Sequence, residues 1–194
     1  QINPESDAVY HQMAQIALQL GETAKAKKFA EKAISIDEKN IWYINFLAGI
    51  LYQENKPDSA MLYYEKAAKI YPDRNDLKLA LGSIYTELGK YESANEIYQK
   101  LEDRYGINEK TTLLHVRSLI SGKEFDDAEK RLKILLQDAP EDIVLNGILA
   151  ELYREKGDNK KASEIYEKLM DLDAANPQTL LSYCDFMLAE KQYD

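Results

Sequence analysis

The sequence predicts an all-α solenoid of about five and a half helical hairpins, and three observations carry this prediction. Five alanines stand 34 residues apart, and such a period is typical of stacked repeats that bury their apolar faces against one another. Apolar residues recur at helical spacing in two blocks per period. A short breaker separates the two blocks. The five alanines are Ala26, Ala60, Ala94, Ala128 and Ala162.

The alanines divide the chain into five complete windows and a partial sixth, which predict a single repeat array over residues 1–194. In the second window, Leu47 and Leu51 mark the first helix, and Ala60 and Ala67 mark the second helix. The same two blocks are expected in each window. The windows, in order, are 7–40, 41–74, 75–108, 109–142, 143–176 and 177–194.

Each complete window carries a breaker that predicts the turn of its hairpin. Glycine or asparagine in the breaker allows a positive φ that ends the first helix, and Pro57 can open the second helix of its hairpin. The positive φ of the fourth turn is accordingly expected at Gly122. The breakers, in order, are Leu20-Gly21-Glu22, Asn55-Lys56-Pro57, Leu88-Gly89-Lys90, Ser121-Gly122-Lys123 and Lys156-Gly157-Asp158.

The third window, with Leu81, Gly82, Tyr85, Gly89, Tyr91, Ala94 and Tyr98, resembles the tetratricopeptide repeat. The family pattern also has a small residue at repeat position 8, and Cys184 occupies that packing position in the sixth window. The resemblance covers essentially the whole chain and implies a right-handed superhelix. The fourth window is the least typical, because His115 stands at position 7, where the other windows have methionine, leucine or tyrosine.

Composition argues against several classes of function. The 25 basic and 34 acidic residues give a net charge of −9, which disfavours a nucleic-acid partner. No apolar run approaches the roughly 20 residues of a membrane span. Two histidines, one cysteine and the absence of a phosphate-binding glycine loop predict no catalytic site, no metal and no cofactor.

The resemblance implies that the first helices line a concave groove that binds a protein or peptide partner. Trp42 is either a binding anchor or packs near Ile36. Arg117 and Arg154 could receive a carboxylate, although pairing with Glu151 or Glu155 is favoured for Arg154. No three consecutive windows supply the residues with which chaperone-binding arrays hold a terminal carboxylate. The predicted groove residues are His11, Gln15, Trp42, Asn45, Tyr52, Gln53, Ser83, Thr86, Glu87, Arg117, Glu151 and Arg154.

The predicted function is a non-catalytic scaffold for protein–protein interaction. The alternatives are a regulatory or substrate-presenting region of a larger enzyme or sensor protein, or assembly of a cell-envelope complex. The chain stops inside a sixth hairpin, so we expect Tyr183, Cys184 and Met187 to form an exposed edge that can self-associate. We expect a soluble protein, cytoplasmic or, if a signal peptide preceded Gln1, periplasmic.

Overall fold

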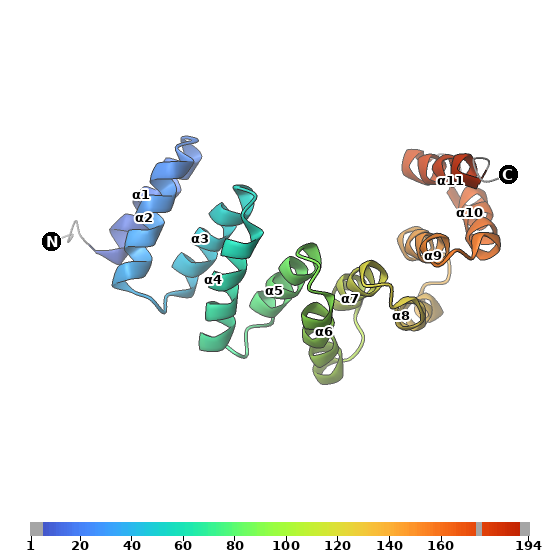
Figure 1. Cartoon of the computed structure of the whole chain (residues 1–194), viewed down its shortest axis with the longest axis horizontal. Coiled ribbons are helices and arrows are strands. Elements are labelled where there is room, and N and C mark those ends of the chain that lie inside the picture. Colours follow the sequence, from blue (N-terminus) through green and yellow to red (C-terminus); the bar gives the residue numbers. More distant parts are fainter. Residues whose placement is uncertain (1–5, 174–175, 191–194) are drawn as a thin grey trace. The chain divides into compact units, whose positions relative to one another are not determined.

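The computed structural model describes residues 6–173 and 176–190, which fold into helices joined by short connections (Figure 1). The described ranges contain no strand, and the predicted all-α hairpin fold is confirmed. The helices are α1 (Asp7–Gln19), α2 (Thr23–Ile36), α3 (Ile41–Gln53), α4 (Pro57–Ile70), α5 (Asn75–Glu87), α6 (Tyr91–Tyr105), α7 (Glu109–Ser121), α8 (Phe125–Asp138), α9 (Ile143–Lys156), α10 (Asn159–Asp173) and α11 (Pro177–Glu190).

The starts of the helices keep one spacing along the described chain. The odd-numbered helices begin at residues 7, 41, 75, 109, 143 and 177, and the even-numbered helices begin at residues 23, 57, 91, 125 and 159. Both series advance by 34 residues. Side chains of Ser6, Asn40, Asn108 and Asp142 accept hydrogen bonds from backbone N–H groups in the first turns that follow them, and Pro57 opens α4.

The turns also share one backbone geometry. A residue with positive φ occurs at Gly21, Asn55, Gly89, Lys123 and Gly157, again every 34 residues. The expectation for the fourth turn is therefore wrong, because Gly122 has a φ of −81° and Lys123 takes the positive value. A Cβ added to Gly122 would lie 3.1 Å from the Cβ of Tyr91 at the start of α6. Gly122 therefore permits the end of α7 to approach the start of α6 closely, and it does not supply the left-handed residue of the turn.

Small side chains stand where helices approach closely. The five alanines of the series are fully buried, as are Ala14, Ala48, Val116 and Ala150 at repeat position 8. Cys184 is different: its thiol is exposed, so its assignment as a packing residue is wrong. The helix that would cover position 8 in this hairpin does not occur among the described residues.

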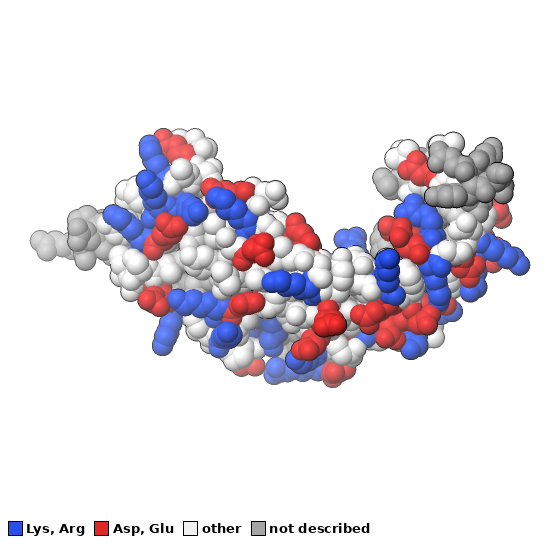
Figure 2. Space-filling view, viewed as in Figure 1, with Lys and Arg blue, Asp and Glu red and all other residues white. Residues whose placement is uncertain are grey.

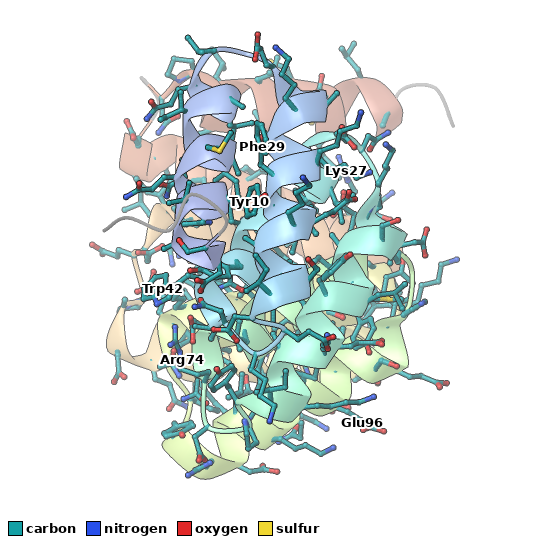
Figure 3. All side chains as sticks on the ribbon, turned by 90° about the vertical axis from the view of Figure 1, so that its left-hand side faces the viewer. Tyr10, Lys27, Phe29, Trp42, Arg74 and Glu96 are labelled. Atoms are coloured by element: carbon teal, nitrogen blue, oxygen red, sulfur yellow. The ribbon has the colours of Figure 1, made fainter. Side chains whose placement is uncertain are left out.

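The chain divides into two compact units at Lys90 and Tyr91, and each is considered by itself. Unit 1 contains α1 to α5, and Ile41, Ile44, Ala67 and Leu77 form a buried cluster within it. Tyr10 and Phe29 stack between α1 and α2 with ring centroids 6.5 Å apart (Figure 3). Apolar faces of successive helices thereby become the core of the unit.

Unit 2 contains α6 to α11, and its core runs from Val116 in α7 to Phe186 in α11. Tyr183 and Met187 of α11 are partly buried against this core, so of the three residues expected at an exposed edge only Cys184 is exposed. The ring of Tyr183 lies 6.0 Å from the ring of Tyr166 in α10, measured between centroids. The large apolar side chains that α11 does expose are Leu180, Leu181 and Leu188.

Candidate functional site

A cavity of about 570 Å³ opens within unit 2 between its first helices. Arg117 of α7, Glu151 and Arg154 of α9, and Ser182 and Asp185 of α11 line it. The structure thus brings together the three predicted groove residues that belong to unit 2. Side chains from three hairpins meet there because successive first helices present the same repeat positions to the same side.

The floor of the cavity is apolar and aromatic. Tyr166 and Leu169 of α10 line it and are almost fully buried, and the Tyr166 ring packs 5.1 Å from that of Phe186 between centroids. Burial raises the pKa of Tyr166; Arg154 lowers it and the carboxylates of Glu151 and Asp185 raise it. The tyrosine is therefore neutral at pH 7. A polar wall over an apolar floor is the usual composition of a binding site.

The two arginines of the cavity differ in their partners. Nη2 of Arg154 lies 3.4 Å from Oε1 of Glu155 on the same helix, so pairing within the helix is confirmed, although the contact is long. Arg117 is exposed, and no ion pair holds it within the described part of the chain. Its guanidinium is available to a carboxylate from outside.

The predicted groove residues of unit 1 fall into two groups. The exposed group is Gln15, Trp42, Tyr52, Gln53 and Glu87. Trp42 is the second residue of α3 (Figure 3) and is 68% exposed, while Ile36 is 51% exposed. Packing of Trp42 against Ile36 is therefore not what the structure shows. Tyr52 and Glu87 are brought together, and their hydrogen bond raises the pKa of Tyr52.

The other group is engaged within unit 1. The imidazole of His11 packs against the rings of Tyr43 and Phe46, at 4.8 and 5.1 Å between centroids, and burial lowers its pKa. The hydroxyls of Ser83 and Thr86 donate to carbonyl groups four residues earlier in α5. Asn45 is partly buried. These four side chains contribute to packing or to their own helix more than to an open surface.

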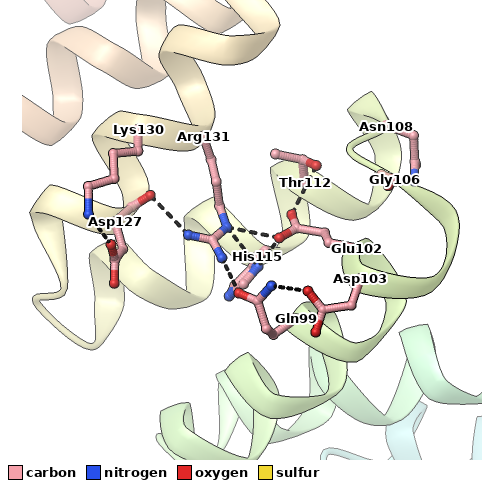
Figure 4. A network of polar contacts seen from close by, with 10 residues as sticks. All are labelled: Gln99, Glu102, Asp103, Gly106, Asn108, Thr112, His115, Asp127, Lys130 and Arg131. Atoms are coloured by element: carbon pink, nitrogen blue, oxygen red, sulfur yellow. Dashed lines mark hydrogen bonds and ion pairs between the residues drawn. The ribbon is translucent and has the colours of Figure 1, made fainter.

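A buried polar network in unit 2 was not predicted from the sequence (Figure 4). The carboxylate of Glu102 in α6 accepts from Thr112 Oγ1 at 3.0 Å, and its Oε2 lies 3.0 Å from both His115 Nδ1 and Arg131 Nε. With Nδ1 of His115 carrying the proton, three donors from α7 and α8 converge on one carboxylate. The Arg131 guanidinium also donates to Gln99 and to the carbonyl of Asp127.

The contacts with His115 and Arg131 decide the ionisation of Glu102. Burial raises the pKa of its carboxyl group. The hydrogen bonds and charges of His115 and Arg131 lower that pKa by a larger amount, so the net pKa is below the ordinary value. Since donors from α7 and α8 hold it and its pKa is lowered, the carboxylate joins α6, α7 and α8 and is a poor base. In the sequence, this network is indicated by His115, which stands at a repeat position where the other windows have an apolar or aromatic residue.

Among the described residues there is neither a cluster of metal ligands nor a membrane-spanning helix. Within residues 6–173 and 176–190, no three His, Cys, Asp or Glu side chains are placed to hold a metal ion. In the same ranges no helix has the length and apolar character needed to cross a membrane. On the face shown in Figure 2, basic and acidic side chains are interspersed.

Tandem hairpins with small residues at their crossings define a helical repeat protein. Models of the tetratricopeptide repeat match residues 51–106 and 119–178, and residues 8–40. The chain belongs to the tetratricopeptide repeat family.

Three known proteins are similar to this chain. Human protein O-mannosyl-transferase TMTC1 is 22% identical over 157 residues, which make up 78% of this chain and 17% of that protein. A tetratricopeptide repeat protein from Parabacteroides merdae superposes with a TM-score of 0.77 at 20% identity, covering 98% of this chain and 74% of that one. YrrB, described as a TPR protein with an unusual peptide-binding site, gives 0.71 at 18% identity, covering 93% of each chain. The two structures show the shared fold.

Proposed function

We propose that this chain is a non-catalytic scaffold that binds an extended or helical segment of a partner protein. The observation that carries the proposal is the cavity of unit 2, where Arg117, Glu151, Arg154 and Asp185 converge over an apolar floor. Repeat arrays of this family usually serve protein–protein interaction, and the peptide-binding site named for YrrB is in keeping with that role.

The chemistry of the cavity favours a peptide of mixed charge. Its volume of about 570 Å³ suits a few side chains of a partner. Arg117 has no competing ion pair in the described chain, so it can receive an acidic side chain or a terminal carboxylate in a bidentate contact. Glu151 and Asp185 can receive a basic side chain beside it. Tyr166 and Leu169 offer an apolar contact below.

We further propose a contact surface in unit 1, made by Trp42 and Tyr52 with Gln15, Gln53 and Glu87 around them. Trp42 and Tyr52 are 68% and 46% exposed. Aromatic side chains supply a large contact area at little loss of conformational entropy, and tryptophan and tyrosine are enriched among residues that dominate binding. Trp42 is the proposed anchor of this surface.

The test begins with selection of binders from a displayed library of random peptides on the immobilised chain. Selected peptides are then titrated against Arg117→Glu, Trp42→Ala and a control, Lys100→Glu, which makes the same charge change as Arg117→Glu at an exposed site on α6. The proposal expects Arg117→Glu or Trp42→Ala to lose at least about tenfold in affinity, a change of about 1.4 kcal/mol. Equal affinity of the two variants and the control would contradict the groove assignment.

A second candidate function is a regulatory or substrate-presenting region of a larger enzyme. The similarity to a protein named as an O-mannosyl-transferase favours it, because the matched segment is only 17% of that protein's length. In that case Arg117→Glu in the complete enzyme would reduce turnover of a protein acceptor and leave turnover of a short peptide acceptor unchanged. Equal effects on both acceptors would argue against this role.

A further inference from the structure

Gly147 lies inside helix α9, one turn after the helix begins, and it lines the cavity of unit 2. Glycine inside a helix is less favourable than alanine, because it loses more backbone entropy on folding and exposes the backbone. A close packing contact would explain it, but a Cβ added at position 147 would meet nothing within 4 Å apart from its own helical turn. Nor does Gly147 have a positive φ. Neither packing nor backbone geometry therefore accounts for the glycine.

The other first helices carry a side chain at the repeat position that Gly147 occupies in α9. In α7, for example, this side chain is partly buried and packs against the core of unit 2. The cavity is thus open at a point where the neighbouring first helices place a side chain. The residues at this position in the other windows are His11, Asn45, Leu79, Leu113 and Leu181.

The part of the cavity lined by Val144, Gly147, Ile148 and Glu151, which we term the slot, has an apolar side and a charged side. Val144 stands one turn before Gly147 and is 59% exposed, and Ile148 is partly buried next to it. Glu151 follows Gly147 by one turn on the same face of α9. Arg117 of α7 lines the same cavity. In the described part of the chain, no ion pair holds Arg117 or Glu151.

We propose that the slot receives one large apolar side chain of a partner segment whose acidic side chain binds Arg117. This inference rests on the proposed function of the cavity as a binding site. A large apolar side chain over Gly147 would remove the exposed Val144 from water. Charge complementarity selects an acidic group for Arg117, while Glu151 disfavours a second acidic group at the slot. Gly147 is then a specificity-determining residue, because a larger residue at this position would exclude the partner's side chain.

A synthetic peptide library with one fixed glutamate tests the chemistry of the partner. The termini of the peptides are blocked, so the glutamate is the only acidic group, and the positions next to it carry alanine, leucine or phenylalanine. Peptides that bind the full chain should carry leucine or phenylalanine beside the glutamate. Replacing that residue by alanine should weaken binding at least about tenfold.

Two glycine variants test the slot itself. Gly147→Leu should lose at least about tenfold in affinity for these peptides, because the new side chain fills the slot. Its midpoint of urea unfolding should rise, since leucine is a better helix former than glycine, so misfolding cannot explain the loss. Gly49→Leu in α3 is the matched control: Gly49 is also partly buried, has nothing within 4 Å of an added Cβ and does not line the cavity. It should gain stability and keep its affinity.

The outcomes separate the slot from the cavity as a whole. Peptides that lose affinity in Arg117→Glu but bind Gly147→Leu as tightly as the unsubstituted chain would overturn the slot and leave the cavity as a binding site. Equal binding of peptides with alanine beside the glutamate would overturn the slot as well. Equal losses in Gly147→Leu and Gly49→Leu would also contradict it. If no peptide binds, or if Arg117→Glu changes nothing, the proposed function of the cavity fails and the slot fails with it.

Discussion

At the turn of the fourth hairpin, Lys123 has a φ of 63° while Gly122 beside it lies in the right-handed region. A residue with a Cβ adopts the left-handed region at a cost of about 1–2 kcal/mol. A larger residue would be crowded at position 122, because a Cβ there would lie 3.1 Å from Cβ of Tyr91 and 3.3 Å from the carbonyl oxygen of Ser118. Lys123 therefore provides the left-handed conformation of the turn, and Gly122 permits the close approach of two helices.

Lys123→Gly is expected to stabilise unit 2 by about 1 kcal/mol, since glycine adopts a positive φ without the steric cost. Gly122→Ala is expected to destabilise it by about 1–3 kcal/mol, because the new methyl group meets Tyr91. Urea unfolding followed by circular dichroism measures both changes. A stabilising Gly122→Ala would show that this close approach is not a constraint.

Glu102 is the residue whose replacement should cost most. Glu102→Gln removes the charge that balances Arg131 inside unit 2, and breaking a buried pair in this way costs about 3–5 kcal/mol. Glu96→Gln is the control, because Glu96 pairs with Lys100 in an exposed contact on the same helix. The free energies of unfolding of the two variants should differ by at least about 2 kcal/mol. Similar losses would mean that the buried network contributes little.

At the scale of the helix, one tyrosine–glutamate contact recurs in both units. Tyr85 of α5 donates to Glu65 of α4 at 2.7 Å, and Tyr153 of α9 donates to Glu129 of α8 at 2.9 Å. Each bond joins a first helix to the second helix of the preceding hairpin. Burial, followed by the glutamate contact, raises the pKa of each of these tyrosines to about 12.

The raised pKa fixes the direction of the pH dependence. A group whose pKa is raised by folding contributes stability that is complete below its ordinary pKa, here 10.0, and is lost as the pH rises toward about 12. Tyr85→Phe and Tyr153→Phe should each cost about 1 kcal/mol near neutral pH, and the cost should disappear as the pH reaches about 12. Ultraviolet titration should lose one late-ionising tyrosine in each variant. Loss of an early-ionising tyrosine would contradict the assignment.

What the sequence could predict depended on whether a feature repeats. Ala60 and Ala94 were assigned to helix crossings because five copies agree, and both are fully buried. The Glu102 network occurs once, so no repetition marked it, and Glu102 and Arg131 look like ordinary surface charges in a helix. Their burial depends on which helices come together around them. Spacing likewise could not show that Tyr183 packs inward while Leu181 is exposed.

At the scale of the whole molecule, the net charge of −9 is the small difference between many basic and many acidic groups. Basic and acidic groups are interspersed on the face shown in Figure 2, so screening acts on the sum of many small contributions.

The constant spacing of the hairpin turns has a consequence for how such a chain can change over generations. A left-handed residue every 34 positions, from Gly21 to Gly157, means that neighbouring hairpins are interchangeable in length. A stretch of coding sequence for one period can be duplicated, deleted or exchanged between copies without shifting any other turn. Recombination inside the gene thus acts on whole structural units, and the length of the array can change while its geometry is inherited unaltered.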